Sequence, residues 1–155
     1  MKHIMPSTAM TLIALSLLLI PTPGLPQDVI EQREKLMESN DKAVKAIRVA
    51  AKEMDYTTLQ VKASDIMDSM GKMLDLFPKG SISETSNAHP DIWDRWDEFS
   101  KHPGKVREAA EALRKAAAAK DDAQINAQVK AIGGLSSGAC GGCHLSFNKK
   151  RMKKG

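Results

Sequence analysis

The sequence predicts an all-α protein that folds as an antiparallel four-helix bundle, and three observations support this class. Apolar residues recur every three or four positions along four successive stretches. No stretch alternates polar and apolar residues with a period of two, and β-branched residues are sparse. The chain has 155 residues, a one-domain length. Mostly short connections between the four stretches favour antiparallel neighbours.

The first two helices are expected at residues 29–54 and 59–77, where the apolar positions follow the helical period. Pro78 stops the second helix, because proline cannot continue the hydrogen-bond pattern. The polar segment at residues 79–89 contains glycine and serines. We expect it to be an ordered crossover loop between the second helix and the third.

The third and fourth helices are expected at residues 92–117 and 125–147. Pro103 and the glycine after it interrupt the middle of the third helix, which predicts a kink or break there. Asp121 or Asp122 precedes the fourth apolar stripe and is the expected N-cap. The fourth helix is predicted to be continuous.

Residues 1–24 have the composition of a secretory signal peptide. Lys2 precedes an apolar run at residues 10–20, and proline and glycine follow it. The run is short for a membrane-spanning helix. We therefore expect cleavage near Gly24, export to the periplasm and a folded domain at residues 25–155. An uncleaved membrane anchor is the alternative.

The excess positive charge of the chain is concentrated at its C-terminal end. The formal net charge is +4, and both signs are mixed along most of the sequence. The exception is a basic C-terminal tail. It consists of Lys149, Lys150, Arg151, Lys153 and Lys154. The tail is either a solvated helix end whose charges suit the helix dipole or a docking patch for an acidic partner. Nucleic-acid binding is not expected, because no aromatic residues interleave the basic ones.

The only two cysteines are Cys140 and Cys143, and His144 directly follows the second. On a continuous helix, Cys143 would lie about 60° from Cys140 on one side and His144 about 40° from it on the other. All three side chains would therefore crowd one arc of the buried helix face.

Four chemistries use residues of these types. A zinc site needs three or four ligands, but the remaining histidines, His3, His89 and His102, stand at no ligand spacing. A dithiol active site normally follows a strand at a helix start, and a structural disulfide is the general alternative for an exported cysteine pair. Cys-x-x-Cys-His is the attachment motif of c-type haem, in which both thiols bind the haem covalently and the histidine binds iron. Only this last interpretation gives Cys140, Cys143 and His144 a role each, so we expect one covalently attached haem c.

Five glycines fall in or beside the predicted fourth helix, and each one inside a helix costs roughly 1 kcal/mol relative to alanine. They are Gly133, Gly134, Gly138, Gly141 and Gly142. We interpret them as room for a flat macrocycle. Its apolar surface would complete a core that an aromatic content of only 4% leaves poorly filled.

A haem motif at the C-terminal end of a four-helix bundle resembles the cytochrome c-prime family, the class II c-type cytochromes. The likeness covers about residues 27–150. Besides CGGCH it includes REKLM in the first helix, LFP at the end of the second, HPDIW at the start of the third and Phe147-x-Lys149-Lys150. The chain departs from the family at Asn148, where relatives often have Arg or Lys four residues after the histidine.

The resemblance also implies two functional branches. In this family the first helix presents a residue to the open side of the iron, commonly four positions after an arginine, which here gives Arg33 and Met37. An apolar residue leaves the iron five-coordinate and able to bind gases such as nitric oxide, whereas methionine completes a low-spin iron. Met37 is therefore the expected sixth ligand, although a methionine at helical spacing is usually core filler. Arg33 and Asn40 are polar residues on the same apolar stripe, and Arg33 is the expected partner of a haem propionate.

An iron with His144 and Met37 as ligands has no free position for a substrate, and a thioether favours the ferrous state. We therefore expect a periplasmic electron-transfer protein that is not an enzyme, with redox partner proteins that the sequence does not identify. A homodimer is one expected assembly, because five-coordinate relatives often pair through their first two helices. The alternatives are a five-coordinate gas-binding protein and a haem-free thiol-disulfide oxidoreductase.

Overall fold

The computed structural model describes residues 26–134 and 136–152, and the expected signal peptide at residues 1–24 lies outside them. Its elements are α1 (Pro26–Glu53), α2 (Tyr56–Lys72), the 3₁₀ helix η1 (Leu74–Leu76), α3 (Asp91–Asp94), α4 (Trp96–Phe99), α5 (Lys101–Ala119), α6 (Asp122–Ile132) and α7 (Gly138–Phe147). No β-strand occurs within these two ranges, which confirms the all-α class. None of the helices there has the length and apolar character needed to cross a membrane.

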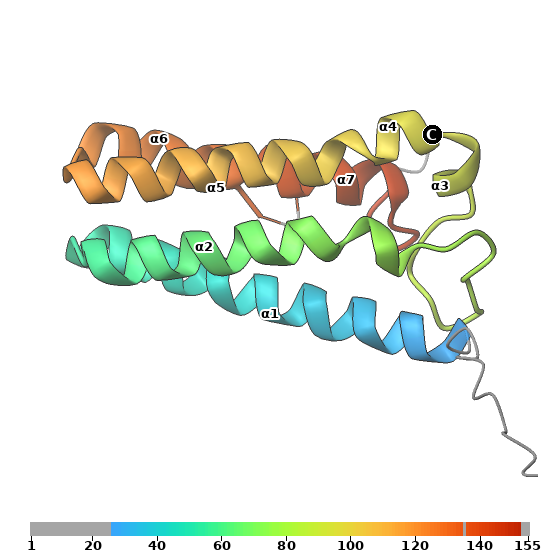
Figure 1. The fold of residues 1–155 in the computed structure, drawn as a ribbon. Helices are drawn as coiled ribbons and strands as arrows, with labels where there is room; N and C mark the ends of the chain where they lie inside the picture. Colours follow the sequence, from blue (N-terminus) through green and yellow to red (C-terminus); the bar gives the residue numbers. More distant parts are fainter. Residues whose placement is uncertain (1–25, 135, 153–155) are drawn as a thin grey trace, which may run out of the picture.

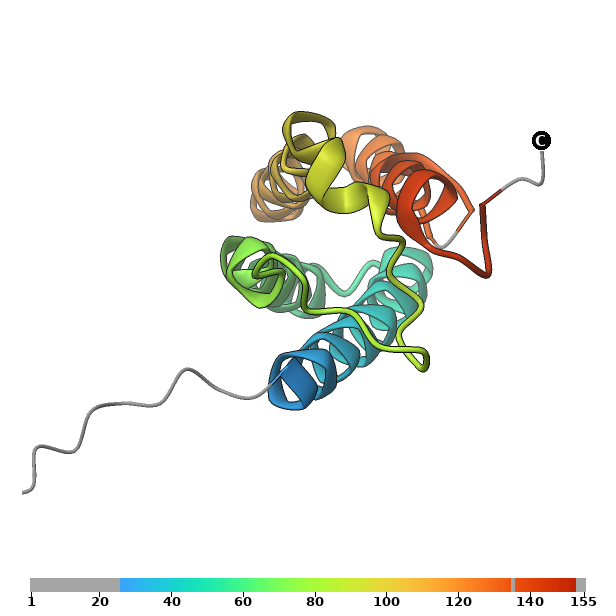
Figure 2. The same cartoon turned by 90° about the vertical axis from the view of Figure 1, so that its right-hand side faces the viewer.

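Helices α1, α2, α5 and α6 form the predicted antiparallel four-helix bundle (Figure 1). α2 packs against α1 and α5, and α6 packs against α5 and α1, so each long helix has two long neighbours. α7 follows α6 along the same corner of the bundle and packs against α5 and α6 (Figure 2). The haem motif therefore lies at the end of the bundle opposite the α1–α2 turn.

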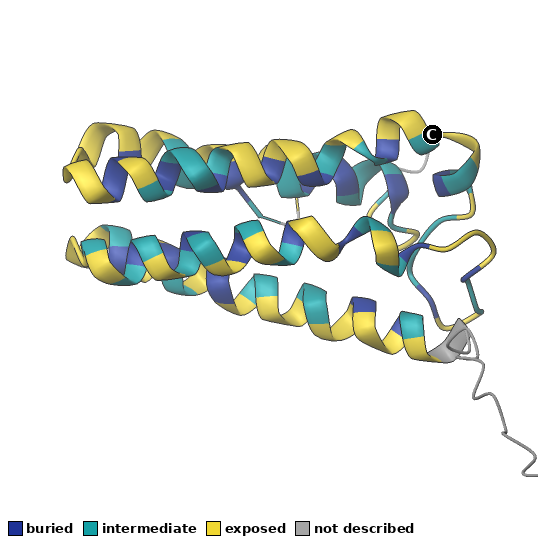
Figure 3. Ribbon diagram, viewed as in Figure 1, coloured by how far each residue is buried: buried dark blue, intermediate teal, exposed yellow. Residues whose placement is uncertain are grey.

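An aliphatic core fills the end of the bundle near the α1–α2 turn. Ile47 on α1, Leu59 on α2 and Leu113 on α5 belong to this core, and all three side chains are almost completely shielded from solvent. Buried positions follow the inward face of each long helix and exposed positions the outward face (Figure 3). The apolar periodicity of the sequence thus predicts which faces pack.

The third predicted helix is interrupted at a different place from the one expected. The breaks fall at Arg95 and Ser100, which separate α3, α4 and α5, whereas Pro103 lies inside the first turn of α5. The first backbone N–H groups of a helix have no intrahelical acceptor, so a proline there removes no hydrogen bond. The prediction of a kink at Pro103 was therefore wrong.

The fourth helix is not continuous as predicted. α6 begins after the N-cap Asp121, whose carboxylate accepts a hydrogen bond from the backbone N–H of Gln124 at 3.0 Å, and it ends at Ile132. Gly133 and Gly138 then adopt positive φ values of 69° and 63°, which L-residues with a side chain rarely adopt. These two glycines let the chain turn sharply between α6 and α7.

The crossover segment between η1 and α3 is ordered, as expected, and it pairs with the C-terminal end of α7. The backbone N–H of His89 donates to the carbonyl oxygen of Phe147 at 2.8 Å. Lys149 Nζ donates to the carbonyl oxygen of Ser86 at 2.9 Å. The crossover therefore closes the end of the bundle that carries the haem motif.

Candidate functional site

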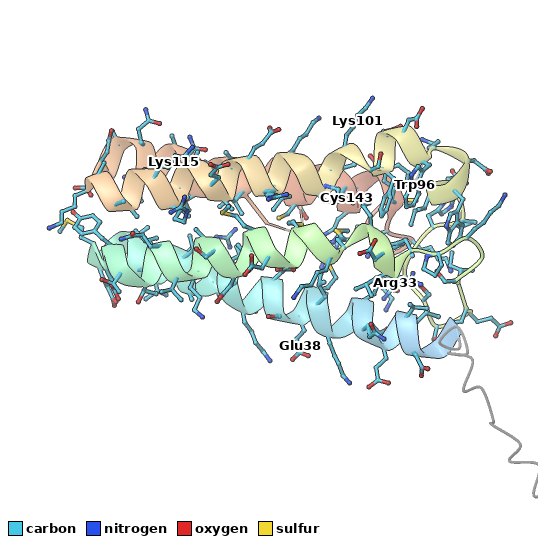
Figure 4. The ribbon with its side chains drawn as sticks, in the orientation of Figure 1. Arg33, Glu38, Trp96, Lys101, Lys115 and Cys143 are labelled. Carbon is cyan, nitrogen blue, oxygen red and sulfur yellow. The ribbon has the colours of Figure 1, made fainter. Side chains whose placement is uncertain are left out.

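The Cys-x-x-Cys-His residues lie on α7 and face the interior of the bundle. Cys143 is buried between the two layers of helices, whereas Glu38 and Lys101 point away from them (Figure 4). Cys140, Cys143 and His144 line a small cavity of about 80 Å³, called here the first cavity. The predicted crowding of the three motif residues on one side of a helix is thus present in the structure.

Opposite α7, the first cavity is lined by residues of α1, α2 and α5 and by Met73, which directly follows α2. They are Met37, Asn40, Asp41, Val44, Ile66, Met70, Met73, His102, Pro103 and Val106. Most of these side chains are apolar, which suits the faces of a flat apolar cofactor. Met37 is therefore brought to the same cavity as the cysteines and the histidine.

A second cavity of about 400 Å³ adjoins the first, within the usual range of ligand pockets, about 300–1,000 Å³. The two cavities share Met37, Met73, Cys143 and His144, so they lie on either side of the same group of residues. Three basic residues and the carboxylate of Glu34 line the second cavity. Its basic residues are Arg33, Lys150 and Arg151.

Both cysteines are free thiols in a poorly solvated position. Burial, with a smaller contribution from the neighbouring Cys140, raises the pKa of Cys143 to about 12. Burial also raises the pKa of Cys140, and the nearby Arg48 partly opposes the rise. Reactive dithiols have lowered pKa values, so the oxidoreductase interpretation does not suit these two residues.

His144 has a buried ring nitrogen, Nδ1, without a hydrogen-bond partner in the described chain. Burial lowers the pKa of this imidazole, and the positive charge of Arg151 lowers it further. The ring is therefore neutral at pH 7, which is the state that can bind a metal. A neutral imidazole with an unsatisfied nitrogen beside two cysteines fits the iron ligand of a c-type haem.

Arg33 is buried on α1 and is only partly satisfied by the protein. Its guanidinium donates to the carbonyl oxygen of Ser81 and to Ser81 Oγ, the latter at 2.9 Å, and its Cζ lies 4.4 Å from the ring centroid of Phe77. Nε and Nη1 are buried and have no hydrogen-bond partner among the described residues, and burial lowers the pKa of the group. A buried cation with free donors beside the second cavity fits a carboxylate of the cofactor.

Sequence reasoning missed two residues of the site, and the fold explains both. His102 was considered only as a zinc ligand, but α5 brings it to the first cavity, with its Cε1 atom 3.5 Å from where a Cβ of Gly142 would lie. Arg151 supplies a positive charge near His144, although relatives often have one at the position of Asn148. Asn148 instead ends α7 and accepts a hydrogen bond from the backbone N–H of Lys150 at 3.1 Å.

The glycines beside the motif serve the turn between the two helices more than the cofactor. A Cβ on Gly133 would overlap the carbonyl oxygen of Ser137, and one on Gly138 would lie 2.6 Å from the carbonyl oxygen of Ala131. A Cβ on Gly141 would also meet the backbone of the turn. The interpretation of these residues as a cradle for a macrocycle is therefore wrong for these three positions.

Comparisons with known proteins agree with this site. Residues 28–148 match the family described as Cytochrome C′. The chain is 32% identical over 151 residues to cytochrome c-554 of Cereibacter sphaeroides, covering 89% of this chain and 95% of that protein. It is also 28% identical over 130 residues to cytochrome c′ of Pararhodospirillum photometricum, covering 80% of this chain and 98% of that protein.

The fold is shared with solved structures of similar length. Cytochrome c′ from Shewanella frigidimarina superimposes with a TM-score of 0.73 at 21% identity and covers 83% of this chain and 99% of its own. Cytochrome c′ from Thermochromatium tepidum gives a TM-score of 0.71 at 19% identity and covers 82% of this chain and 99% of its own. The sequence match, the bundle and the buried Cys-x-x-Cys-His site lead to the same conclusion. The chain belongs to the cytochrome c′ family of class II c-type cytochromes, whose members carry one covalently attached c-type haem.

Proposed function

We propose that this haem protein is a periplasmic electron carrier in which Cys140 and Cys143 would hold the haem and His144 and Met37 would be the two protein ligands of the iron. The observation that carries the proposal is that Met37 on α1 lines the same two cavities as Cys143 and His144 on α7. When bound, the haem supplies a one-electron redox centre. The remaining functions belong to the side chains around it.

Each side chain has a distinct task in this proposal. The cysteines fix the cofactor, and the neutral ring of His144 binds the iron. The Met37 sulfur would be the second protein ligand of the iron, which would exclude substrates and favour the reduced state. Because these residues lie on separate helices of a packed bundle, the site changes little on electron transfer. An occupied and rigid site suits a carrier rather than an enzyme.

Periplasmic location and partner binding extend the proposal. Members of the family are in general periplasmic, and the signal-like composition of residues 1–24 supports the same location for this chain. Lys149 bonds to the crossover loop, whereas Lys150 and Arg151 are exposed beside the second cavity. These two cations would face an acidic surface on a redox partner close to the haem.

A homodimer is part of the same proposal. Three large apolar side chains are exposed on α1, α2 and the turn between them: Val49 at 54%, Met54 at 58% and Val61 at 51%. If these side chains form one surface patch, that patch would suit contact with a second copy of the chain. Sedimentation at increasing protein concentration measures the assembly. A monomer at all concentrations would remove this part of the proposal.

A five-coordinate gas-binding protein is the second candidate function. Relatives named cytochrome c′ stand beside relatives named cytochrome c-554 and cytochrome c-556 among the matches, so gas binding fits the family equally. The first cavity also contains Met70 and Met73, which shows that a methionine there can serve as packing. The two candidates differ in whether Met37 binds iron.

A Met37→Ala variant tests the ligand assignment. If Met37 is a ligand, the haem should stay attached, the ferrous spectrum should change from low-spin to high-spin, the reduction potential should fall and carbon monoxide should bind rapidly. Met73→Ala is the matched control, because Met73 lines both cavities and should leave the spin state unchanged. Rapid carbon monoxide binding by the wild type, with no spectral effect of Met37→Ala, would favour the gas-binding function.

Covalent attachment is tested separately. Protein produced with a c-type maturation pathway should keep haem staining on a denaturing gel, and a Cys140→Ala, Cys143→Ala variant should lose it. A colourless wild type with two titratable thiols, produced under the same conditions, would contradict haem attachment itself.

A further inference from the structure

Asn40 carries a buried side-chain nitrogen, Nδ2, that has no hydrogen-bond partner among the described residues. Asn40 lies three positions after Met37 on α1, so the two side chains share one side of the helix. Both line the first cavity, together with Cys140, Cys143 and His144. A buried amide donor is normally paired, so we expect Asn40 to find an acceptor once the cofactor site is filled.

In the described chain, no side chain around the first cavity accepts a hydrogen bond from Asn40. Most are aliphatic or thioether groups. The neighbouring carboxylate of Asp41 is already paired, with Lys45 Nζ at 2.6 Å from its Oδ2 atom. Arg33, the other polar residue on the same stripe of α1, bonds to Ser81 and lines the second cavity instead. Among these polar groups of α1, the Asn40 amide is therefore the one that lines the first cavity and still lacks a hydrogen-bond partner in the described chain.

We propose that the Asn40 amide donates a hydrogen bond to the ligand that binds the iron on the side facing α1. This inference rests on the proposed haem site. The acceptor is either the sulfur of Met37, because a thioether accepts weak hydrogen bonds, or the outer atom of a small diatomic ligand. Both candidates are hydrogen-bond acceptors that belong to the sixth ligand of the iron. In this proposal, the hydrogen bond from Asn40 determines how tightly that ligand is bound.

The two acceptors give different measurable effects. A hydrogen bond to the Met37 sulfur withdraws electron density from it, which favours reduced iron and raises the reduction potential. A hydrogen bond to the oxygen of bound carbon monoxide weakens the C–O bond and lowers its stretching frequency. A net hydrogen bond of ordinary strength corresponds to about a fivefold change in an equilibrium or a dissociation rate.

The test replaces Asn40 with leucine, which has a similar shape and no donor, in the haem-loaded protein. In the wild-type background, Asn40→Leu should lower the reduction potential. In the Met37→Ala background it should raise the C–O stretching frequency and release carbon monoxide about fivefold faster. Ser69→Ala is the control, because the Ser69 hydroxyl is also buried and unpartnered but is not among the residues lining either cavity. Asn40→Ala provides a second variant if the Asn40→Leu protein does not fold or does not bind haem.

The outcomes separate this inference from the proposed function. A change of potential alone identifies the Met37 sulfur as acceptor, and a change of stretching frequency alone identifies the diatomic ligand. If Met37→Ala leaves the spin state unchanged, the Met37 assignment fails, and the stretching frequency of carbon monoxide on the wild type and on Asn40→Leu still tests Asn40. Equal potentials and equal frequencies with and without the Asn40 amide overturn the inference.

Discussion

Individual residues around the haem motif share one physical property, which is burial without full hydrogen bonding. Within the part of the chain that the structure describes, Arg33 Nε and Nη1, His144 Nδ1 and Asn40 Nδ2 are all buried without partners. Such groups are expensive in a folded protein, and here they line two adjoining cavities. A cofactor with a metal and carboxylates would give partners to His144 and Arg33, and the proposed acceptor at the iron would pair with Asn40. This explains why these groups are concentrated in this part of the molecule.

At this scale we predict the effect of removing the buried guanidinium. Arg33→Leu should lower the free energy of unfolding of the haem-loaded protein by roughly 1–3 kcal/mol, the cost of charge-assisted hydrogen bonds. It should also lower the reduction potential, because a nearby positive charge disfavours the more positive ferric state. Chemical denaturation and redox titration measure the two effects. Arg107→Leu, at an exposed position, is the matched control and should change neither quantity.

The elements of the bundle differ in how much their sequences constrain them. α1, α2 and α5 follow their apolar stripes over most of their length, whereas α6 and α7 are separated by a turn that depends on Gly133 and Gly138. The turn is held to the first helix, because Arg48 Nη2 donates to the carbonyl oxygen of Gly133 at 3.1 Å. The orientation of the haem motif therefore depends on a few backbone positions before α7.

At the scale of elements we predict opposite effects for two glycine substitutions. Gly133→Ala should destabilise the protein by more than about 1 kcal/mol and reduce the yield of haem-loaded protein, because the new methyl group meets the Ser137 carbonyl at a positive φ. Gly71→Ala should stabilise it by about 0.4–1 kcal/mol, since Gly71 lies inside α2 with nothing within 4 Å of a Cβ. Thermal unfolding and haem absorbance check both variants. Equal stability of the two would show that the turn tolerates a side chain at Gly133.

The molecule as a whole has two ends with different packing. The end near the α1–α2 turn has a closed aliphatic core around Leu59, Ala63 and Leu113, each with 0% exposure. The opposite end contains both cavities and is closed by the crossover loop and by the aromatic rings of Phe77, Phe99 and Phe147. The cofactor therefore completes one half of the core rather than all of it.

At this scale we predict that loss of the haem reduces helix content unevenly. The Cys140→Ala, Cys143→Ala variant should show clearly less helix by circular dichroism. Amide hydrogen exchange should accelerate mainly in residues 26–40 and in α7, while residues around Leu59 and Leu113 stay protected. The wild type loaded with haem is the reference. If the variant is as helical, as cooperative and as protected as the wild type throughout, the cofactor is not part of the core.

Much of the site could be predicted from the sequence, because the relevant signals are local. Apolar periodicity predicts the four helical stretches and their inward faces. The spacing of Cys140, Cys143 and His144 is a local feature of the sequence, so it identifies a haem attachment motif without knowledge of the fold. The place of Met37 rested on a family pattern. The structure brings it to the motif but brings Met73 there as well, so the choice between them stays a prediction.

Only the tertiary structure decided how distant segments meet. Three contacts of this kind surround the motif. Arg33 pairs with Ser81 and His102 approaches Gly142, although the members of each pair are far apart in the sequence. The turn after α7 brings the charge of Arg151 near His144. The helix breaks were also misplaced by sequence reasoning, because a proline or glycine has a different effect at a helix end than in its middle. Local periodicity therefore determined the helices and the haem motif, whereas packing between helices decided which polar groups were left buried around the motif.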